Sequence, residues 1–238
     1  MIITKTLQYH DAHNTYEGYM SWDSDFPGKR PGILIAPTFR GQSEFENKKA
    51  EELAKMGYLG FAIDLYGKGI RANSPEEAQQ LMDSLNNNRP LLLKRMQLAL
   101  DTLQNHEQVD AGRLGAIGFC FGGKCVLDLA RSGAAIQGTV TFHGVYDKPD
   151  IPYHAPITSS LLILHGWEDP LATPDQTVAL AKELTGRGAD WQLHAFGHTG
   201  HAFTNPNAKF PEKGMFYQEQ SNNRAWKLMV DFFQERFY

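Results

Sequence analysis

From residue 32 onward, short apolar runs alternate with stretches that have the periodicity of amphipathic helices. The apolar runs are residues 32–36, 58–63, 113–117, 136–142, 160–165 and 191–196. The helical stretches include residues 44–56, a helix starting at Ser74-Pro75, a longer helix after Arg89-Pro90, and residues 174–186 and 224–237. Strands that alternate with helices in this way form parallel sheets covered on both faces. The pattern predicts an α/β fold with a mostly parallel central sheet of about eight strands.

The N-terminal 25 residues follow a different pattern. The run Thr15–Trp22 predicts an antiparallel hairpin at the edge of the sheet. The rest of the chain contains no repeat, linker or low-complexity segment, and 238 residues suffice for one sizeable core. We therefore predict a single domain over residues 1–238, either a monomer or a homodimer.

Charge and composition exclude several classes of partner. The chain has 23 basic and 27 acidic residues, a net charge of -4, and no block of like charge. This argues against a nucleic-acid partner and against a membrane surface. No apolar run approaches the roughly 20 residues of a membrane span, and the N-terminus lacks a signal-peptide pattern. With only two cysteines, one of them in a reactive motif, we expect a cytoplasmic protein.

The segment Gly118–Gly123, with sequence GFCFGG, lies between an apolar strand and a helical stretch. A strand, a sharp glycine-rich turn and a helix are the context of a nucleophile elbow, and Cys120 occupies the position of the attacking residue. The alternative is a small buried apolar residue, since free cysteines are often buried. Cys125, which has no motif around it, is expected in the core.

Two later strands run into loops that supply an acid and a base. Asp169 follows the strand 160–165, and His201 follows the strand 191–196. In parallel sheets such residues meet at the carboxyl ends of the strands. The order Cys120, Asp169, His201 is that of nucleophile, acid and base in α/β hydrolases. Glu168 remains an alternative acid, and His198 an alternative base.

Two further histidines end strands beside glycines. His143 and His165 are expected to line the site or to satisfy backbone groups. The nine histidines include no metal-ligand spacing such as His-Glu-x-x-His. We predict no metal and no cofactor.

The chain resembles the dienelactone hydrolase family of α/β hydrolases. The matching motifs are the elbow Gly118–Gly123, the Gly-x-x-Asp loop at 166–169 and the Gly-His-x-Phe segment at 200–203. Asp64-Leu65-Tyr66 extends the likeness. The resemblance implies hydrolysis of a small ester or lactone by Cys120, Asp169 and His201, and it favours Asp169 over Glu168 and His201 over His198.

The oxyanion formed by such an attack needs two backbone donors. The amide of Phe121 directly follows the nucleophile, at the positive end of the helix dipole. The resemblance places the second donor at Phe39, in the loop after the strand 32–36. The helix dipole and His201 are both expected to lower the pKa of the Cys120 thiol.

The chain departs from the family at three positions that bear on the substrate. Thr38 stands where the family has a glutamate that takes part in thiol activation. Lys68 and Asn205 stand where relatives bind a substrate carboxylate with arginines, which weakens the case for a carboxylated lactone. Arg40 and Arg71 either compensate or are solvated loop residues.

Aromatic residues flank the motifs and predict an apolar pocket for a neutral ester or lactone. They are Phe39, Phe119, Phe121, Trp167 and Phe203, of which roughly half are expected to be core. Within enzymes the alternatives are a thioesterase or a true carboxymethylenebutenolidase. Outside enzymes, the alternative is a catalytically silent ligand-binding or redox-sensing protein on the same fold.

Overall fold

The computed structural model describes residues 1–153 and 155–238. The sheet has eight strands in the order β1-β2-β4-β3-β5-β6-β7-β8 and is mostly parallel, which confirms the predicted α/β fold class. The chain divides into two compact units, Met1–Ile117 and Gly118–Tyr238, which are described in turn. None of the helices in the described residues is both long and apolar enough to cross a bilayer.

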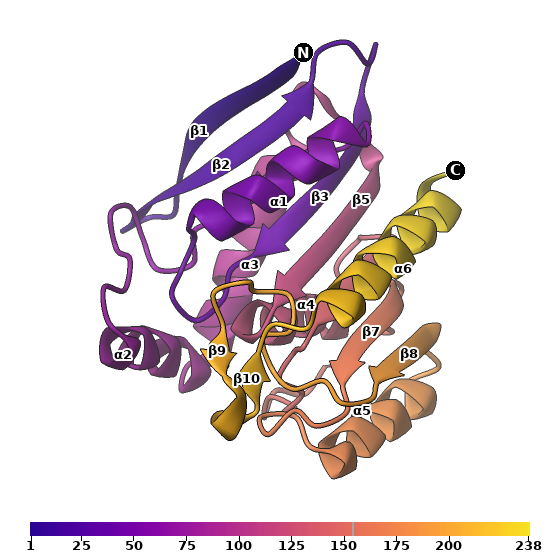
Figure 1. Ribbon diagram of the computed structural model, residues 1–238. Helices are drawn as coiled ribbons and strands as arrows, with labels where there is room; N and C mark the ends of the chain where they lie inside the picture. Colours follow the sequence, from indigo (N-terminus) through magenta and orange to yellow (C-terminus); the bar gives the residue numbers. More distant parts are fainter. Residues whose placement is uncertain (154) are drawn as a thin grey trace. The chain divides into compact units, whose positions relative to one another are not determined.

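The first unit contains an N-terminal antiparallel pair, as predicted, followed by parallel strands and three helices (Figure 1). Its elements are β1 (Ile2–His10), β2 (Thr15–Asp23), β3 (Arg30–Ala36), α1 (Glu44–Lys55), β4 (Leu59–Ala62), α2 (Pro75–Asn86), α3 (Arg89–Gln104) and β5 (Val109–Phe119), whose last two residues belong to the second unit. Each of the three helices begins after a side-chain N-cap, at Ser43, Ser74 and Asn88.

Two glycines show how closely the helices approach this part of the sheet. A Cβ on Gly60 of β4 would lie 2.6 Å from Cα of Ala50 in α1. A Cβ on Gly32 of β3 would lie 3.1 Å from a side-chain carbon of Leu103 in α3. Because Gly60 pairs with Ile33, the neighbour of Gly32, the two glycines face opposite sides of the pleat. The helices α1 and α3 therefore cover opposite faces (Figure 1).

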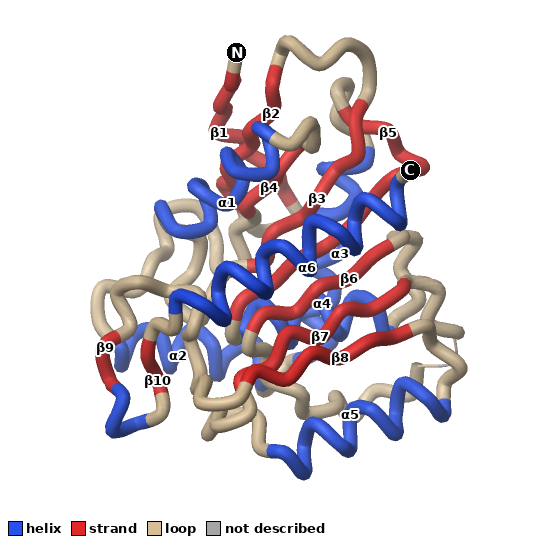
Figure 2. Tube along the Cα trace, turned by 45° about the vertical axis from the view of Figure 1, so that its right-hand side comes forward, coloured by secondary structure: helices blue, strands red, loops and turns tan. Residues whose placement is uncertain are grey.

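The second unit has three parallel strands with helices on both sides (Figure 2). Its elements are α4 (Phe121–Arg131), β6 (Gly138–Phe142), β7 (Ser160–Gly166), α5 (Pro174–Gly186), β8 (Trp191–Phe196), β9 (Lys209–Phe210), a 3-10 turn η1 (Pro211–Lys213), β10 (Met215–Phe216) and α6 (Glu219–Phe237). Leu161 and Ile163 of β7 pack with Leu127 of α4 and Leu180 of α5. Helix α6 covers the other face, where Phe233 lies against Gly138.

The structure differs from the sequence-based elements at several places, the largest being β5, which spans Val109–Phe119 where 113–117 was predicted. Helix α6 begins at Glu219 rather than at 224, because Gln218 caps a first turn that is too polar to show helical periodicity. Strand β6 begins at Gly138, because pairing with β7 starts there, rather than at residue 136. The two-residue strands β9 and β10 were not predicted, since a pair that short leaves no alternating pattern.

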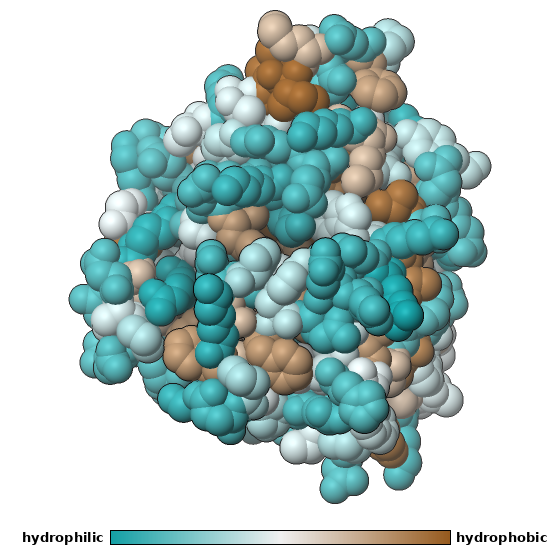
Figure 3. All heavy atoms as spheres, viewed as in Figure 1, coloured by the Kyte–Doolittle hydropathy of each residue, from teal (hydrophilic) through white to brown (hydrophobic). Residues whose placement is uncertain are grey.

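The face of the molecule seen in Figure 3 is largely hydrophilic, and its apolar residues are scattered in small groups. On α1, the outward side is lined by ion pairs such as Lys48–Glu44 at 2.9 Å. Such exposed pairs contribute little to stability, but they keep the outer surface of the helix polar.

Candidate active site

Cys120 lies at the turn between β5 and α4, as the elbow motif predicts. Its backbone has φ 56 and ψ -117, a conformation that L-residues rarely adopt. The N–H of Cys120 donates to the carbonyl of Phe142 at the end of β6, at 3.1 Å. The turn is thus held against the neighbouring strand, and the half-buried thiol lies at the N-terminus of α4.

Gly118 is the residue that makes this turn sterically possible. A Cβ at this position would lie 2.1 Å from the carbonyl oxygen of Gly122, which is far inside van der Waals contact. The obstacle is backbone at the start of α4 rather than a flexible side chain.

Gly118→Ala is accordingly expected to destabilise the protein by about 3 kcal/mol or more, because strand and helix must separate to admit the methyl group. Denaturant unfolding followed by circular dichroism measures this. Gly186→Ala is the matched control, since a Cβ there meets nothing within 4 Å, and its effect should lie between neutral and a gain of about 1 kcal/mol. Equal stability of the two variants would contradict the steric argument.

Asp169 and His201 form a buried hydrogen-bonded pair. The Nδ1 atom of His201 lies 2.7 Å from Oδ2 of Asp169, and both side chains are almost fully buried. Since a carboxylate only accepts, Nδ1 carries the proton. The other carboxylate oxygen accepts the N–H of Leu171 at 2.8 Å, which fixes the acid. Nε2 of His201 is buried and has no partner of hydrogen-bond geometry among the described residues.

The loops that hold this acid and base pack directly against each other. A Cβ on Gly166 would lie 2.5 Å from the carbonyl oxygen of Gly200, so the backbones are nearly in contact. The N–H of Glu168 donates to the carbonyl of Thr199 at 3.0 Å. His201 is tied in turn to the short β9–β10 hairpin, because its N–H donates to the carbonyl of Gly214 at 2.7 Å.

The thiol and the imidazole shift each other's titration. Burial, the largest single effect, opposes charge on both groups. The interaction with His201 nevertheless lowers the pKa of Cys120 below its usual 9.0. The thiolate and the hydrogen bond to Asp169 raise the pKa of His201 to about 10. The arrangement therefore favours a thiolate next to an imidazolium.

The alternative acid and base pair with each other at the surface. Glu168 and His198 lie 3.2 Å apart, and the His198 side chain is 98% exposed. Within the described part of the chain, neither side chain forms a hydrogen bond or ion pair with Cys120, Asp169 or His201. The geometry thus distinguishes an exposed pair from a buried one.

His143 packs against the imidazole of His201. Their ring centroids are 4.9 Å apart in an edge-to-face arrangement. The Phe203 ring also lies against His143, with 5.1 Å between the ring centroids. Nε2 of His143 shares a 2.8 Å hydrogen bond with the hydroxyl of Thr204. Burial and the charge of His201 hold the pKa of His143 well below its usual value, so this ring stays neutral. Phe203 is fully buried and belongs to the core.

His165 lies in a separate network of hydroxyl groups. Its Nδ1 shares a hydrogen bond with the hydroxyl of Tyr146 and its Nε2 with that of Thr177, each at 3.2 Å. Burial lowers the pKa of His165. The His165 ring also lies edge-to-face against the ring of Trp167, which is exposed. Both ring nitrogens of His165 are thus engaged, and the ring links β7 to Tyr146 and to Thr177 of α5.

The substrate residues predicted in the first unit have their own partners. Lys68 pairs with Glu17 at 3.4 Å. Arg71 donates hydrogen bonds to Asp64, to Gln42 and to three backbone carbonyls, so its guanidinium is engaged within the protein.

The remaining predicted pocket residues have local contacts within their own loops. Arg40 is exposed, with its guanidinium 5.9 Å from the centroid of the Phe39 ring. Thr38 donates its N–H to the buried carboxylate of Glu46 at 3.1 Å. In the second unit, Asn205 accepts the N–H of Asn207 at 2.9 Å, which stabilises the turn after His201.

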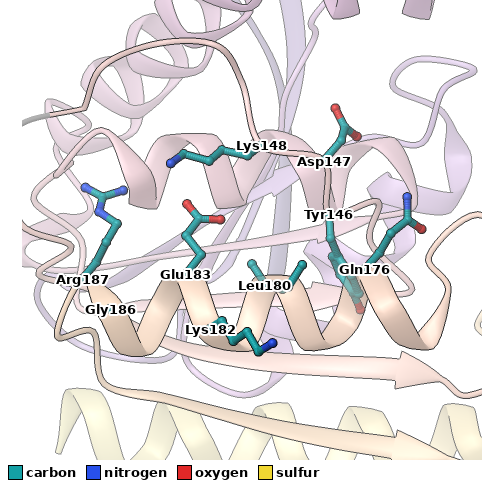
Figure 4. Close-up of a pocket in the computed structure, with 10 residues that line it drawn as sticks. Tyr146, Asp147, Lys148, Gln176, Leu180, Lys182, Glu183, Gly186 and Arg187 are labelled. Carbon is teal, nitrogen blue, oxygen red and sulfur yellow. The ribbon is translucent and has the colours of Figure 1, made fainter.

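A cavity of ≈ 480 Å³ lies between α5 and the segment after β6 (Figure 4). Its lining includes Tyr146, Asp147, Lys148 and Glu183, and none of Cys120, Asp169 or His201. The cavity is therefore not formed by the proposed catalytic residues.

In residues 1–153 and 155–238, no group of three or more histidine, cysteine or carboxylate side chains is arranged to hold a metal ion.

Residues 17–237 match the sequence model of the dienelactone hydrolase family. The chain belongs to the dienelactone hydrolase family. The solved structure described as m3DLH has 36% identity and a TM-score of 0.95, covering 100% of this chain and 99% of that one. A dienelactone hydrolase-like promiscuous phosphotriesterase from metagenomic libraries has 31% identity and a TM-score of 0.93, with coverage of 100% and 99%. A Bradyrhizobium sp. protein, described as a probable 2-oxo-3-(5-oxofuran-2-ylidene)propanoate lactonase, is 28% identical over 74% of each chain. Membership makes this protein a hydrolase of the dienelactone hydrolase type.

The roles of three residues of this family member were not predicted from the sequence. Thr204 holds His143, while Glu46 and Tyr66 hold the loop of Phe39. The spacing Ser43-x-x-Glu46 is a readable capping box, and the structure confirms its reciprocal bonds. Thr204 and the hydroxyl of Tyr66 act through tertiary contacts that leave no local pattern.

Proposed function

We propose that this protein hydrolyses small neutral esters or lactones through an acyl-enzyme formed on Cys120, with His201 as acid and base and Asp169 orienting it. The observation that carries the proposal is the buried 2.7 Å bond between Asp169 and His201, beside a thiol whose pKa is lowered. With Cys120 as the proposed nucleophile, a chain of only two cysteines favours a reducing compartment such as the cytoplasm.

In the proposed mechanism the Cys120 thiolate attacks the carbonyl carbon, a C–S bond forms and the carbonyl π pair moves to oxygen. The amides of Phe121 and Phe39 donate to that oxyanion. As the C–O bond breaks, the imidazolium of His201 protonates the leaving alkoxide. Water then attacks the thioester while Nε2 of His201 takes its proton. Collapse releases the acid and restores the thiolate and imidazolium, and Asp169 keeps the imidazole in one tautomer throughout.

The substrate class rests on the charged residues available for recognition. Thr38 offers no carboxylate, Asn205 no charge, and Lys68 is already paired with Glu17. With Arg71 engaged by Asp64, the family's carboxylate clamp lacks its two arginines. Hydrolysis rates on a panel of neutral esters, acyl thioesters and dienelactone test this. A clear preference for dienelactone would point instead to a true carboxymethylenebutenolidase, and one for thioesters to a thioesterase.

Acyl-enzyme formation is tested with p-nitrophenyl acetate. Rapid mixing should show a burst of nitrophenolate that matches the enzyme concentration, with acetyl located on Cys120 by mass spectrometry. Acetyl on another residue, with Cys120 unmodified, would refute the assigned nucleophile. Absence of turnover on the whole panel would favour a ligand-binding or redox-sensing role.

Alkylation by iodoacetamide should report the lowered pKa of the thiol. Since only the thiolate reacts, the rate is expected to rise as pH increases through a midpoint below 9.0 and then to stay level. The rate is measured by loss of activity between pH 5 and 10. A midpoint at or above 9.0 would contradict an ion pair between Cys120 and His201.

Phosphotriester hydrolysis is a second candidate activity. The relative described as a promiscuous phosphotriesterase shares 31% identity and nearly the whole length of this chain. Paraoxon and p-nitrophenyl acetate release the same nitrophenolate, so one assay compares attack at phosphorus with attack at carbon. Turnover of paraoxon that disappears with Cys120 would add this activity to the same nucleophile.

A further inference from the structure

The loop after β3 holds the peptide between Thr38 and Phe39 in one orientation. The carbonyl of Thr38 accepts the N–H of Gly41 at 3.0 Å. A trans peptide is planar, so its N–H points away from its carbonyl oxygen. The N–H of Phe39 is therefore directed out of the turn. This N–H has no hydrogen-bond partner among the described residues.

The peptide groups on either side are fixed by two side chains from other elements. The N–H of Thr38 donates to Oε1 of Glu46 in α1 at 3.1 Å. The carbonyl of Phe39 accepts the hydroxyl of Tyr66, which follows β4, at 2.9 Å. Rotation of the intervening peptide would disturb both bonds as well as the bond from Gly41.

Glu46 binds this loop through backbone and hydroxyl groups alone. It is fully buried, and its second oxygen accepts the N–H of Ser43 at 2.9 Å and the Ser43 hydroxyl at 2.6 Å. No lysine, arginine or histidine pairs with it in the part of the chain that the structure describes. Burial raises the pKa of Glu46, and the bonds from Ser43 and Thr38 oppose that rise. A buried carboxylate with these partners is a positioning group for the loop.

Tyr66 is itself held in place by the buried Asp64. The carboxylate of Asp64 accepts the N–H groups of Tyr66 and Gly67, each at 3.0 Å. The main chain that presents the Tyr66 hydroxyl is thus rigid, and the side chain is almost fully buried. The carbonyl of Phe39 consequently has a fixed donor.

We propose that Glu46 and Tyr66 are positioning residues that preset the Phe39 N–H as the second oxyanion donor. The proposal rests on the function proposed above and concerns one step of it, the stabilisation of the tetrahedral intermediate. A preset donor needs no reorganisation when the oxyanion forms, which is why its orientation affects the rate rather than substrate binding.

Tyr66→Phe removes only the hydroxyl and tests the proposal directly. With p-nitrophenyl acetate, kcat should fall about 10- to 100-fold while KM changes less than about threefold, since loss of a whole oxyanion donor lowers kcat about 10²- to 10³-fold. The rate and pH dependence of iodoacetamide alkylation should stay unchanged, because that reaction forms no oxyanion. Affinity for an aldehyde that adds to Cys120 as a tetrahedral hemithioacetal should fall in parallel with kcat.

Tyr19→Phe is the matched control, since it removes a tyrosine hydroxyl bonded to Glu51 rather than to the loop. Its kcat should stay within about twofold of the parent enzyme. Glu46→Gln, checked for folding by thermal melting, should reproduce the loss of kcat seen in Tyr66→Phe. Unchanged kcat in folded Tyr66→Phe, or a shift of its alkylation profile, would overturn the proposal. A parent enzyme whose turnover survives Cys120→Ala would instead refute the proposed function.

Discussion

Cys120→Ala is expected to reduce kcat for p-nitrophenyl acetate at least about 10⁴-fold, because the covalent route needs the sulfur atom. The residual rate should equal that of water attack in a site that still binds the ester. Steady-state hydrolysis, corrected for the uncatalysed reaction, gives the ratio. Thermal melting should show little change, since the residue is only half-buried and contributes no side-chain cap to α4.

Cys125→Ala provides the control for this experiment. It removes the other cysteine, which is fully buried on α4, and should leave kcat within about twofold while lowering stability. A Cys120→Ala enzyme with full turnover, or loss of activity in Cys125→Ala with its fold intact, would rule out the assigned nucleophile.

His201→Gln and Asp169→Asn are expected to reduce kcat/KM by about 10³- to 10⁴-fold each. The first variant removes the base, and the second lets the imidazole adopt the wrong tautomer. In His201→Gln the alkylation midpoint should move up to 9.0 or beyond, because burial, the largest effect, raises the thiol pKa and the two lowering effects of His201 are gone. Kinetics at several pH values and the alkylation profile measure both effects.

The chain provides neighbouring controls for both substitutions. His198→Gln and Glu168→Gln change the exposed pair, in which His198 lies three residues before His201 and Glu168 directly precedes Asp169. Each should keep kcat/KM within about threefold. If these variants lost activity and the Asp169 and His201 variants retained it, the acid and base would have to be reassigned to the exposed pair.

Much of this structure follows from local sequence signals. Alternating apolar runs and helical stretches predicted the order of elements, and the elbow glycines predicted the sharp turn at Cys120. The loops after β7 and β8 were predicted because residues at carboxyl ends of parallel strands converge. The bond between Asp169 and His201 is the geometry expected from that convergence.

Contacts that depend on side-chain length and strand register could not be predicted from the sequence. The pairing of Lys68 with Glu17 requires the register of β2, and the capture of Arg71 by Asp64 requires the turn after β4. Both changed how the candidate substrate residues are interpreted. The role of Glu46 was hidden for another reason, since its capping box explains a helix start and says nothing of a bond to Thr38.

The opposing influences on His201 give the proposed reaction an internal order. Burial pushes the imidazole toward its neutral form, and the nearby thiolate is the strongest influence that keeps it protonated. When the sulfur becomes a thioester its negative charge is gone, so the affinity of His201 for its proton drops at that moment. The leaving group receives the proton, and a free base is left for the incoming water. Acylation of Cys120 thereby acts as the signal that converts its neighbour from acid to base.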